Sequence, residues 1–196
     1  MSYREKLRLV VIIGSVRKGR FGPTAAEWMA RRAERHPAFD VDVIDLAAAW
    51  LPDVMSAAPE EVKPQAVQDL EPWLAAADAF VVVTPEYNHS YPASLKNAID
   101  WYDAEWHAKP VAFLSYGGAS GGLLAVGHLR QVFAECHAVT VRETVSLQDY
   151  LERRVAGGHL DDDPAHVRDA DRMLDRLAWW GRALRAARRR DPFNVN

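Results

Sequence analysis

The segment from Gly14 to Thr24 combines glycines, hydroxyl side chains and a positive charge in a way that suits a bound phosphate. It follows a strand-like apolar run and precedes a helix-like pattern, so backbone N–H groups and the positive end of the helix dipole can face an anion there. Ser15 and Thr24 contribute hydroxyl groups, and Arg17 contributes charge. The segment therefore predicts a phosphate-binding turn.

Two common phosphate-binding motifs do not match this turn. The spacing of Gly14 and Gly19 imitates the start of a nucleotide-triphosphate P-loop, but Arg20 and Phe21 stand where that motif requires lysine and Ser or Thr. The dinucleotide fingerprint also fails, because no second glycine stands two residues after Gly14. The turn therefore fits a monophosphate, and we interpret Lys18 and Arg20 as solvated side chains.

A second loop, Pro85 to Tyr91, lies between a predicted buried strand and a predicted helix. Residues 80–83 form a short β-branched run with no polar alternation, as in a parallel strand covered on both faces. Pro85 ends this strand, and Pro92 suits the first turn of the following helix, where its missing N–H is no loss. In open α/β sheets, ligands bind at such carboxyl-edge loops.

Metal-ion and nucleophile chemistry find no support in the sequence. The histidines are scattered without zinc-like spacing, and Ser15 and Ser115 have no Ser-His-Asp context. We expect the single cysteine, Cys136, to be buried and inert. His89 lies within the second loop; we interpret it as a surface histidine, with proton donation to a bound acceptor as the alternative.

Strand-like runs alternate with helical patterns along the chain, which predicts an α/β fold with a parallel sheet. A proline-punctuated loop over Leu51–Pro64 precedes a short helix that should kink or restart at Pro72. The five predicted strands are Leu7–Ile13, Val41–Leu46, Ala79–Thr84, Val111–Ser115 and a run near Val139–Val141.

Four segments follow one another in order along the chain: Gly14-Ser15-Val16-Arg17, Pro85-Glu86-Tyr87-Asn88, Leu95-Lys96-Asn97-Ala98-Ile99-Asp100-Trp101 and Ser115-Tyr116-Gly117-Gly118-Ala119-Ser120-Gly121-Gly122. Together they resemble the NAD(P)H-dependent FMN reductase family, and the resemblance covers roughly residues 7–141. The resemblance implies a flavodoxin-like three-layer sandwich with a five-stranded parallel sheet of order 2-1-3-4-5, formed by residues 1–196 as a single FMN-binding domain.

The resemblance also implies a site for FMN, with no catalytic side chain because the cofactor carries the chemistry. Two departures from the usual family pattern occur in the first turn, where Arg20 replaces serine and Gly22 replaces asparagine. We consider two roles for Tyr87: packing on the flavin ring, and ordinary packing within its own loop. The phosphate would be held by Ser15, Arg17, Phe21, Gly22 and Thr24, and the ring would lie between Pro85, Glu86, Tyr87 and Asn88 on one side and Ser115, Gly117 and Gly118 on the other.

The activity implied is hydride transfer from NADPH or NADH through FMN to a quinone, free flavin, azo compound or similar acceptor in a ping-pong cycle. One alternative is a non-enzymatic flavodoxin-like electron carrier or redox-sensing flavoprotein. Such carriers are typically more acidic than this chain, whose net charge is -3. A second alternative is a nucleotide-binding regulatory domain without redox chemistry. The glycine pair Gly117-Gly118 and the Pro85–Asn88 loop disfavour this alternative.

Composition gives no case for a nucleic-acid or membrane partner. The run Arg182–Arg190 suits the negative end of a final helix, and no apolar stretch approaches the roughly 20 residues of a membrane span. The N-terminus lacks a secretory pattern, so we expect a cytoplasmic protein. From the resemblance we also expect a homo-oligomer, dimer or tetramer, with the helix at residues 92–101 in its interface.

Overall fold

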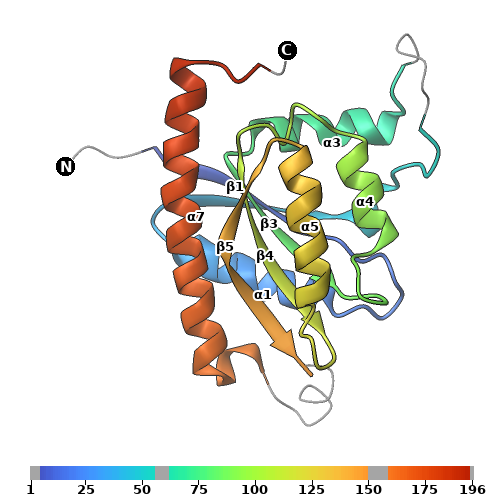
Figure 1. Ribbon diagram of the computed structural model, residues 1–196, viewed down its shortest axis with the longest axis vertical. Coiled ribbons are helices and arrows are strands. Elements are labelled where there is room, and N and C mark those ends of the chain that lie inside the picture. Colours follow the sequence, from blue (N-terminus) through green and yellow to red (C-terminus); the bar gives the residue numbers. More distant parts are fainter. Residues whose placement is uncertain (1–4, 56–61, 150–158, 195–196) are drawn as a thin grey trace.

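The computed structural model describes residues 5–55, 62–149 and 159–194, and in this part of the chain five parallel strands form one sheet (Figure 1). The strand order β2-β1-β3-β4-β5 confirms the flavodoxin-like arrangement predicted above. The strands are β1 (Leu7–Ile13), β2 (Phe39–Asp45), β3 (Ala79–Pro85), β4 (Pro110–Gly117) and β5 (Val139–Gln148).

The central strands are buried on both faces, as the apolar run at residues 80–83 predicts for β3. Every residue of β3 is buried, and β1 is buried except at Arg8. The strand predicted near Val139–Val141 is longer than expected and continues to Gln148. Its mixed, half-buried pattern gives no apolar run to detect, and its pairing with β4 is irregular between Val111 and Phe113.

Helices cover both faces of the sheet and form the outer two layers (Figure 1). One core cluster joins the sheet to α1 (Gly22–Arg35) and α7 (Pro164–Arg190). A second joins the opposite face to α3 (Gln65–Ala76), α4 (Ala93–Asp100) and α5 (Leu123–Glu135). A single turn, α2 (Leu46–Ala49), follows β2, and a short 3-10 turn (Leu160–Asp162) precedes α7.

The sequence predicted that the helix here, α3, would kink or restart at Pro72. The restart was wrong, because a single helix runs from Gln65 to Ala76. Proline has no backbone N–H, so the hydrogen bond that another residue at position 72 would donate to the carbonyl of Gln68 is missing. Pro72 and Gln68 are both exposed, so water can satisfy that carbonyl. The predicted loop before this helix, Leu51–Pro64, includes residues 56–61, which lie outside the described part of the chain.

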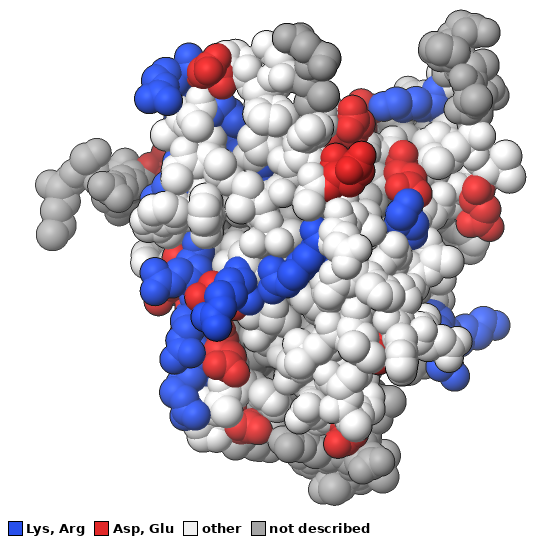
Figure 2. Space-filling view, in the orientation of Figure 1, with Lys and Arg blue, Asp and Glu red and all other residues white. Residues whose placement is uncertain are grey.

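The arginines near the end of α7 make specific contacts besides matching the helix dipole. Arg185 and Arg188 both pair with Asp78, at 3.1 and 3.3 Å, and also donate to backbone carbonyls before β1 and β4. Figure 2 shows the basic side chains along the α7 edge interspersed with acidic ones. No helix in the described ranges is both long and apolar enough to cross a membrane.

Candidate functional site

Three loops meet at the carboxyl edge of β1, β3 and β4, which are neighbours in the sheet. They are the loop from Gly14 to Phe21 after β1, the loop from Glu86 to Pro92 after β3, and the loop from Gly118 to Gly122 after β4. Strand order reverses between β1 and β3, and open α/β sheets bind ligands at this point.

The first loop is fixed to its neighbours by hydrogen bonds. The Gly14 N–H donates to the Val83 carbonyl at 2.9 Å, and the Ser94 hydroxyl of α4 donates to the Gly14 carbonyl at 2.7 Å. Ser15 is fully buried, and its hydroxyl lies 2.7 Å from the hydroxyl of Tyr87. This contact joins the predicted phosphate loop to the predicted ring loop.

The loop then feeds into α1, whose first turn faces the site. Gly22 is the first helical residue, and Thr24 is exposed two positions later. Arg17 is exposed in the loop before the helix. The structure therefore brings Ser15, Arg17, Gly22 and Thr24 to one helix N-terminus, where N–H groups and the helix dipole favour an anion.

Arg20 does not fit the interpretation as a solvated side chain. Its guanidinium pairs with Asp45 at the end of β2, and its Nε is buried without a hydrogen-bond partner in the described structure. Asp45 also accepts the N–H of Ala47 at 3.0 Å and so caps α2. Lys18, by contrast, is exposed.

The second loop is a tight turn with unusual backbone angles. Tyr87 and Ser90 exchange two backbone hydrogen bonds of 2.8 and 3.0 Å, and the two residues between them have positive φ, +49° for Asn88 and +67° for His89. Asparagine and histidine are both enriched among the few non-glycine residues that adopt such angles. Both residues are exposed at the tip of the turn.

Glu86 connects the second loop to the third. Its N–H donates to the Tyr116 carbonyl at 3.0 Å, and its carboxylate accepts the N–H of Leu124, in the first turn of α5, at 3.1 Å. This carboxylate therefore caps a helix and acts as a structural hydrogen-bond acceptor.

The third loop has two glycines that the fold requires and one that lies open. Gly121 and Gly122 have φ of +59° and +85°, and a Cβ on Gly122 would lie 2.7 Å from the Ser115 Cβ. Ser115 is fully buried and donates to the Gly121 carbonyl at 2.8 Å. A Cβ on Gly118 would meet no atom nearer than the Asp149 carboxylate at 4.0 Å.

These loops provide donors suited to a flat ligand with one phosphate. A hydroxyl, a helix N-terminus and an exposed arginine lie at the α1 end, and the open backbone of Gly118 lies at the β4 end. The buried hydroxyl of Tyr116, beside the start of α1, has no hydrogen-bond partner among the described residues. In the same part of the chain no three His, Cys, Asp or Glu side chains are placed to hold a metal ion.

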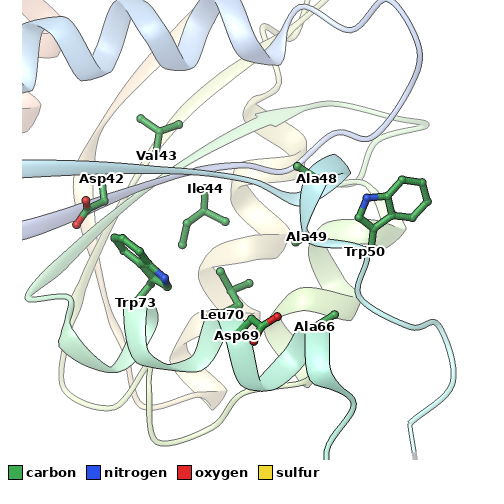
Figure 3. A pocket seen from close by; sticks show the side chains of 10 residues that line it. All are labelled: Asp42, Val43, Ile44, Ala48, Ala49, Trp50, Ala66, Asp69, Leu70 and Trp73. Carbon is green, nitrogen blue, oxygen red and sulfur yellow. The ribbon is translucent and has the colours of Figure 1, made fainter.

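A separate pocket of about 560 Å³ lies on the outer side of β2 (Figure 3). Ile44 of β2 and Leu70 of α3 point toward each other across it, while the exposed Trp50 side chain points away. No residue of the three loops lines this pocket, so it is distinct from the candidate site.

The fold and the three loops define a flavodoxin-like protein with a carboxyl-edge ligand site. More narrowly, the chain belongs to the NADPH-dependent FMN reductase family, which matches residues 7–152. This is a family of oxidoreductases that use FMN and NAD(P)H.

Relatives agree with that assignment. The chain is 40% identical over 134 residues to an NAD(P)H-dependent FMN reductase of Schizosaccharomyces pombe, covering 62% of this chain and 66% of that protein. It is 34% identical over 159 residues to a quinone reductase of Escherichia coli K12, covering 77% and 82%. The flavoenzyme NAD(P)H:(acceptor) oxidoreductase FerB of Paracoccus denitrificans shares the fold, with a TM-score of 0.68 at 23% identity over 90% of this chain and 98% of that one.

The sequence did not predict the contacts that two residues make beside this site. Tyr116 follows Ser115 in a buried strand, so its type and position indicate only core packing. Arg20 stands where the family pattern has serine, and its partner Asp45 is 25 residues away in the sequence. A positively charged residue with a distant acidic partner gives no local signal, because the pairing depends on the strand order.

Proposed function

We propose that this protein is an FMN-dependent NAD(P)H oxidoreductase that reduces a quinone, free flavin, azo compound or similar small acceptor in a ping-pong cycle. One observation carries the proposal: three loops meet at the point where strand order reverses, beside the N-terminus of α1. The quinone reductase named above supports a quinone-type acceptor. A cytoplasmic location stays a prediction of the sequence.

We propose that the phosphate of FMN is held at the first turn of α1 and that the ring lies between the second and third loops. At the phosphate, Ser15, Arg17 and Thr24 act through their side chains, while Phe21 and Gly22 act through their amides. At the ring we assign Pro85, Glu86, Tyr87, Asn88, Ser115, Gly117 and Gly118. When bound, FMN accepts hydride from NAD(P)H and delivers it to the acceptor.

The individual residues mainly orient the ligand and donate hydrogen bonds to it. Tyr87 and Ser15 join the phosphate and ring loops through their 2.7 Å contact, so both ends of the ligand are positioned together. The open backbone at Gly118 allows close approach of the ring, and preorganised N–H donors can stabilise negative charge that develops on the reduced ring. No side chain in this proposal transfers a proton.

We further propose that residues 1–196 act as one FMN-binding domain and that the protein is a homo-oligomer, dimer or tetramer, through the α4 helix. Trp101, just after α4, donates to the Pro52 carbonyl at 2.9 Å. Asn97 donates to the same carbonyl at 3.0 Å, so it is a structural contact to the preceding loop rather than a solvated residue.

A direct test uses the purified protein under anaerobic conditions. Reconstitution should give a flavin spectrum, NADPH or NADH should bleach it, and a quinone added after the nicotinamide should restore it. Acid-released cofactor should run as FMN, because the first loop offers one phosphate position and no second motif for an adenosine half. Release of FAD, or failure to bind flavin, would contradict the proposal. A protein that bleaches but is not reoxidised by small acceptors would favour the electron-carrier alternative.

A further inference from the structure

Tyr116 is a buried tyrosine with an unused hydroxyl. It lies near the end of β4, is 6% exposed, and packs edge-on against Phe21 with ring centroids 5.1 Å apart. The hydroxyl has no hydrogen-bond partner among the described residues. Burial raises the pKa of this phenol well above its ordinary value, so it is protonated and can donate.

An unpaired buried hydroxyl is unusual, because a buried polar group without a hydrogen-bond partner destabilises the folded protein. Tyr102, on the opposite face of the sheet, shows the ordinary arrangement. It is 3% exposed, and its hydroxyl donates to the Val67 carbonyl at 3.1 Å. Unlike the Tyr102 hydroxyl, the Tyr116 hydroxyl therefore has a hydrogen bond left to donate.

The position of the hydroxyl indicates what kind of group would accept this hydrogen bond. It lies 3.2 Å from the point that a Cβ on Gly22 would occupy, at the first residue of α1. The Ser15 hydroxyl and the Gly22 N–H lie close enough to oppose the rise in its pKa that burial causes, although neither is in hydrogen-bonding geometry with it. Helix N-termini favour anions, so an anionic acceptor placed here would meet the hydroxyl, the helix dipole and Ser15 together.

We propose that the Tyr116 hydroxyl is a binding residue for the phosphate of FMN, to which it donates a hydrogen bond. The proposal rests on the proposed function and adds to it a phosphate donor that comes from the sheet rather than from the first loop. Gly22 is required for this arrangement, because a side chain there would also lie 2.8 Å from Ile13 Cγ2. The buried Nε of Arg20, in the same loop, is a second donor without a partner in the described structure.

The test compares Tyr116→Phe with wild type in the binding of FMN and of riboflavin, which lacks the phosphate. Flavin fluorescence titration of the apoprotein gives both dissociation constants. We expect the variant to bind FMN about tenfold more weakly, as for loss of a hydrogen bond to a charged group, and to bind riboflavin as wild type does. Tyr102→Phe is the matched control and should leave both constants unchanged.

A second measurement is the melting temperature of the apoprotein. Tyr116→Phe should melt at the same temperature as wild type or higher, because it removes an unpaired polar group, whereas Tyr102→Phe should melt lower. Inorganic phosphate alone should raise the melting temperature of wild type more than that of Tyr116→Phe.

Each contrary outcome overturns a defined statement. Unchanged FMN affinity in Tyr116→Phe, an equal loss for riboflavin, or a lower apoprotein melting temperature would overturn the role of Tyr116 alone. Failure of wild type to bind either flavin would overturn the proposed function and the role of Tyr116 with it.

Discussion

At the scale of single residues, the backbone of the third loop carries more of the proposed chemistry than any titratable side chain. Gly118 has no positive φ, and a Cβ there would meet no described atom nearer than 4.0 Å, so we expect the fold to tolerate Gly118→Val. The substitution should instead obstruct the flavin ring. His89 is exposed at the tip of the second loop, and alanine would face the same positive φ of +67°, so His89→Ala removes only the imidazole.

We therefore expect Gly118→Val to lose most flavin reduction or reoxidation, and His89→Ala to slow turnover only modestly. The two half-reactions are measured separately by stopped-flow absorbance, with FMN content determined for each variant. Gly127→Val, at another open glycine on α5, serves as the control. If reoxidation collapses in His89→Ala at full FMN occupancy while Gly118→Val is unaffected, the chemistry has been assigned to the wrong group.

A second prediction at this scale concerns the two exposed basic residues of the first loop. Arg17→Ala should weaken FMN binding about tenfold or more relative to Lys18→Ala, because only Arg17 matches the phosphate position of the family pattern, and a charge-assisted hydrogen bond is worth about 1.5–3 kcal/mol. Dissociation constants at low and high salt measure this. Equal losses for the two variants would reduce Arg17 to a general surface charge.

The sequence placed at the carboxyl edge of the sheet those candidate residues whose neighbours in the chain carry a signal. Glu86 follows a strand-ending proline, and Ser15 follows a glycine turn, so both could be placed at the carboxyl edge before the structure was known. Tyr116 and Arg20 could not, because their roles depend on which residues β1, β2 and α1 bring beside them. Such contacts are set by strand order, which local patterns do not encode.

At the scale of elements, a buried lysine ties the end of α3 to the start of β4. Lys109 is 5% exposed, and its ammonium donates to the Leu74 and Ala75 carbonyls, each at 2.8 Å. Burial, followed by the nearby Arg188 guanidinium, lowers the pKa of Lys109 from its ordinary 10.5 to about 8. The charged form is therefore disfavoured in the folded protein relative to the unfolded chain.

This shift predicts a pH-dependent stability. Between about pH 8 and 10.5 the folded protein has released a proton that the unfolded chain still holds, so stability rises with pH across this window. Below pH 8 Lys109 is protonated in both the folded and the unfolded protein, so its buried charge lowers the unfolding free energy by a constant amount. Relative to Lys109→Met, wild type should gain up to about 3 kcal/mol of unfolding free energy over the window.

Urea unfolding of both proteins at several pH values between 7 and 10.5 gives this difference directly. Taking the difference between the two proteins removes the titration of groups that they share. Parallel curves for wild type and Lys109→Met would contradict the lowered pKa of Lys109.

The bounds of some helices and strands could be predicted from the sequence, and those of others could not. The first strand, Leu7–Ile13, was predicted with the bounds observed, because an apolar run interrupted only by Arg8 ends at a glycine turn. The length of β5 was not, since its residues alternate irregularly between buried and half-buried. Pro72 misled the prediction of α3, because a single lost hydrogen bond on an exposed face does not end a helix held by buried Val67 and Leu74.

At the scale of the whole molecule, several exposed apolar side chains occur along the chain from β2 to α3, in a stretch that contacts the helix proposed for the interface. The Pro52 carbonyl fixes this segment to α4 by accepting hydrogen bonds from Asn97 and Trp101. Apolar surface of this kind is typical of protein interfaces. The exposed residues are Val43, Trp50, Val54, Met55, Val62 and Trp73.

We therefore expect the oligomer interface to extend from α4 onto the loop that carries Val54 and Met55, which are 83% and 44% exposed. Two charges placed there would be buried unpaired in the interface, so the double variant Val54→Asp, Met55→Asp should shift the protein toward monomer. Trp179→Asp is the control, because Trp179 is 59% exposed on α7, across the sheet from α4. Light scattering at micromolar concentration measures the masses. A monomeric wild-type protein would contradict the interface altogether, and an unchanged oligomer in the double variant would exclude this loop from it.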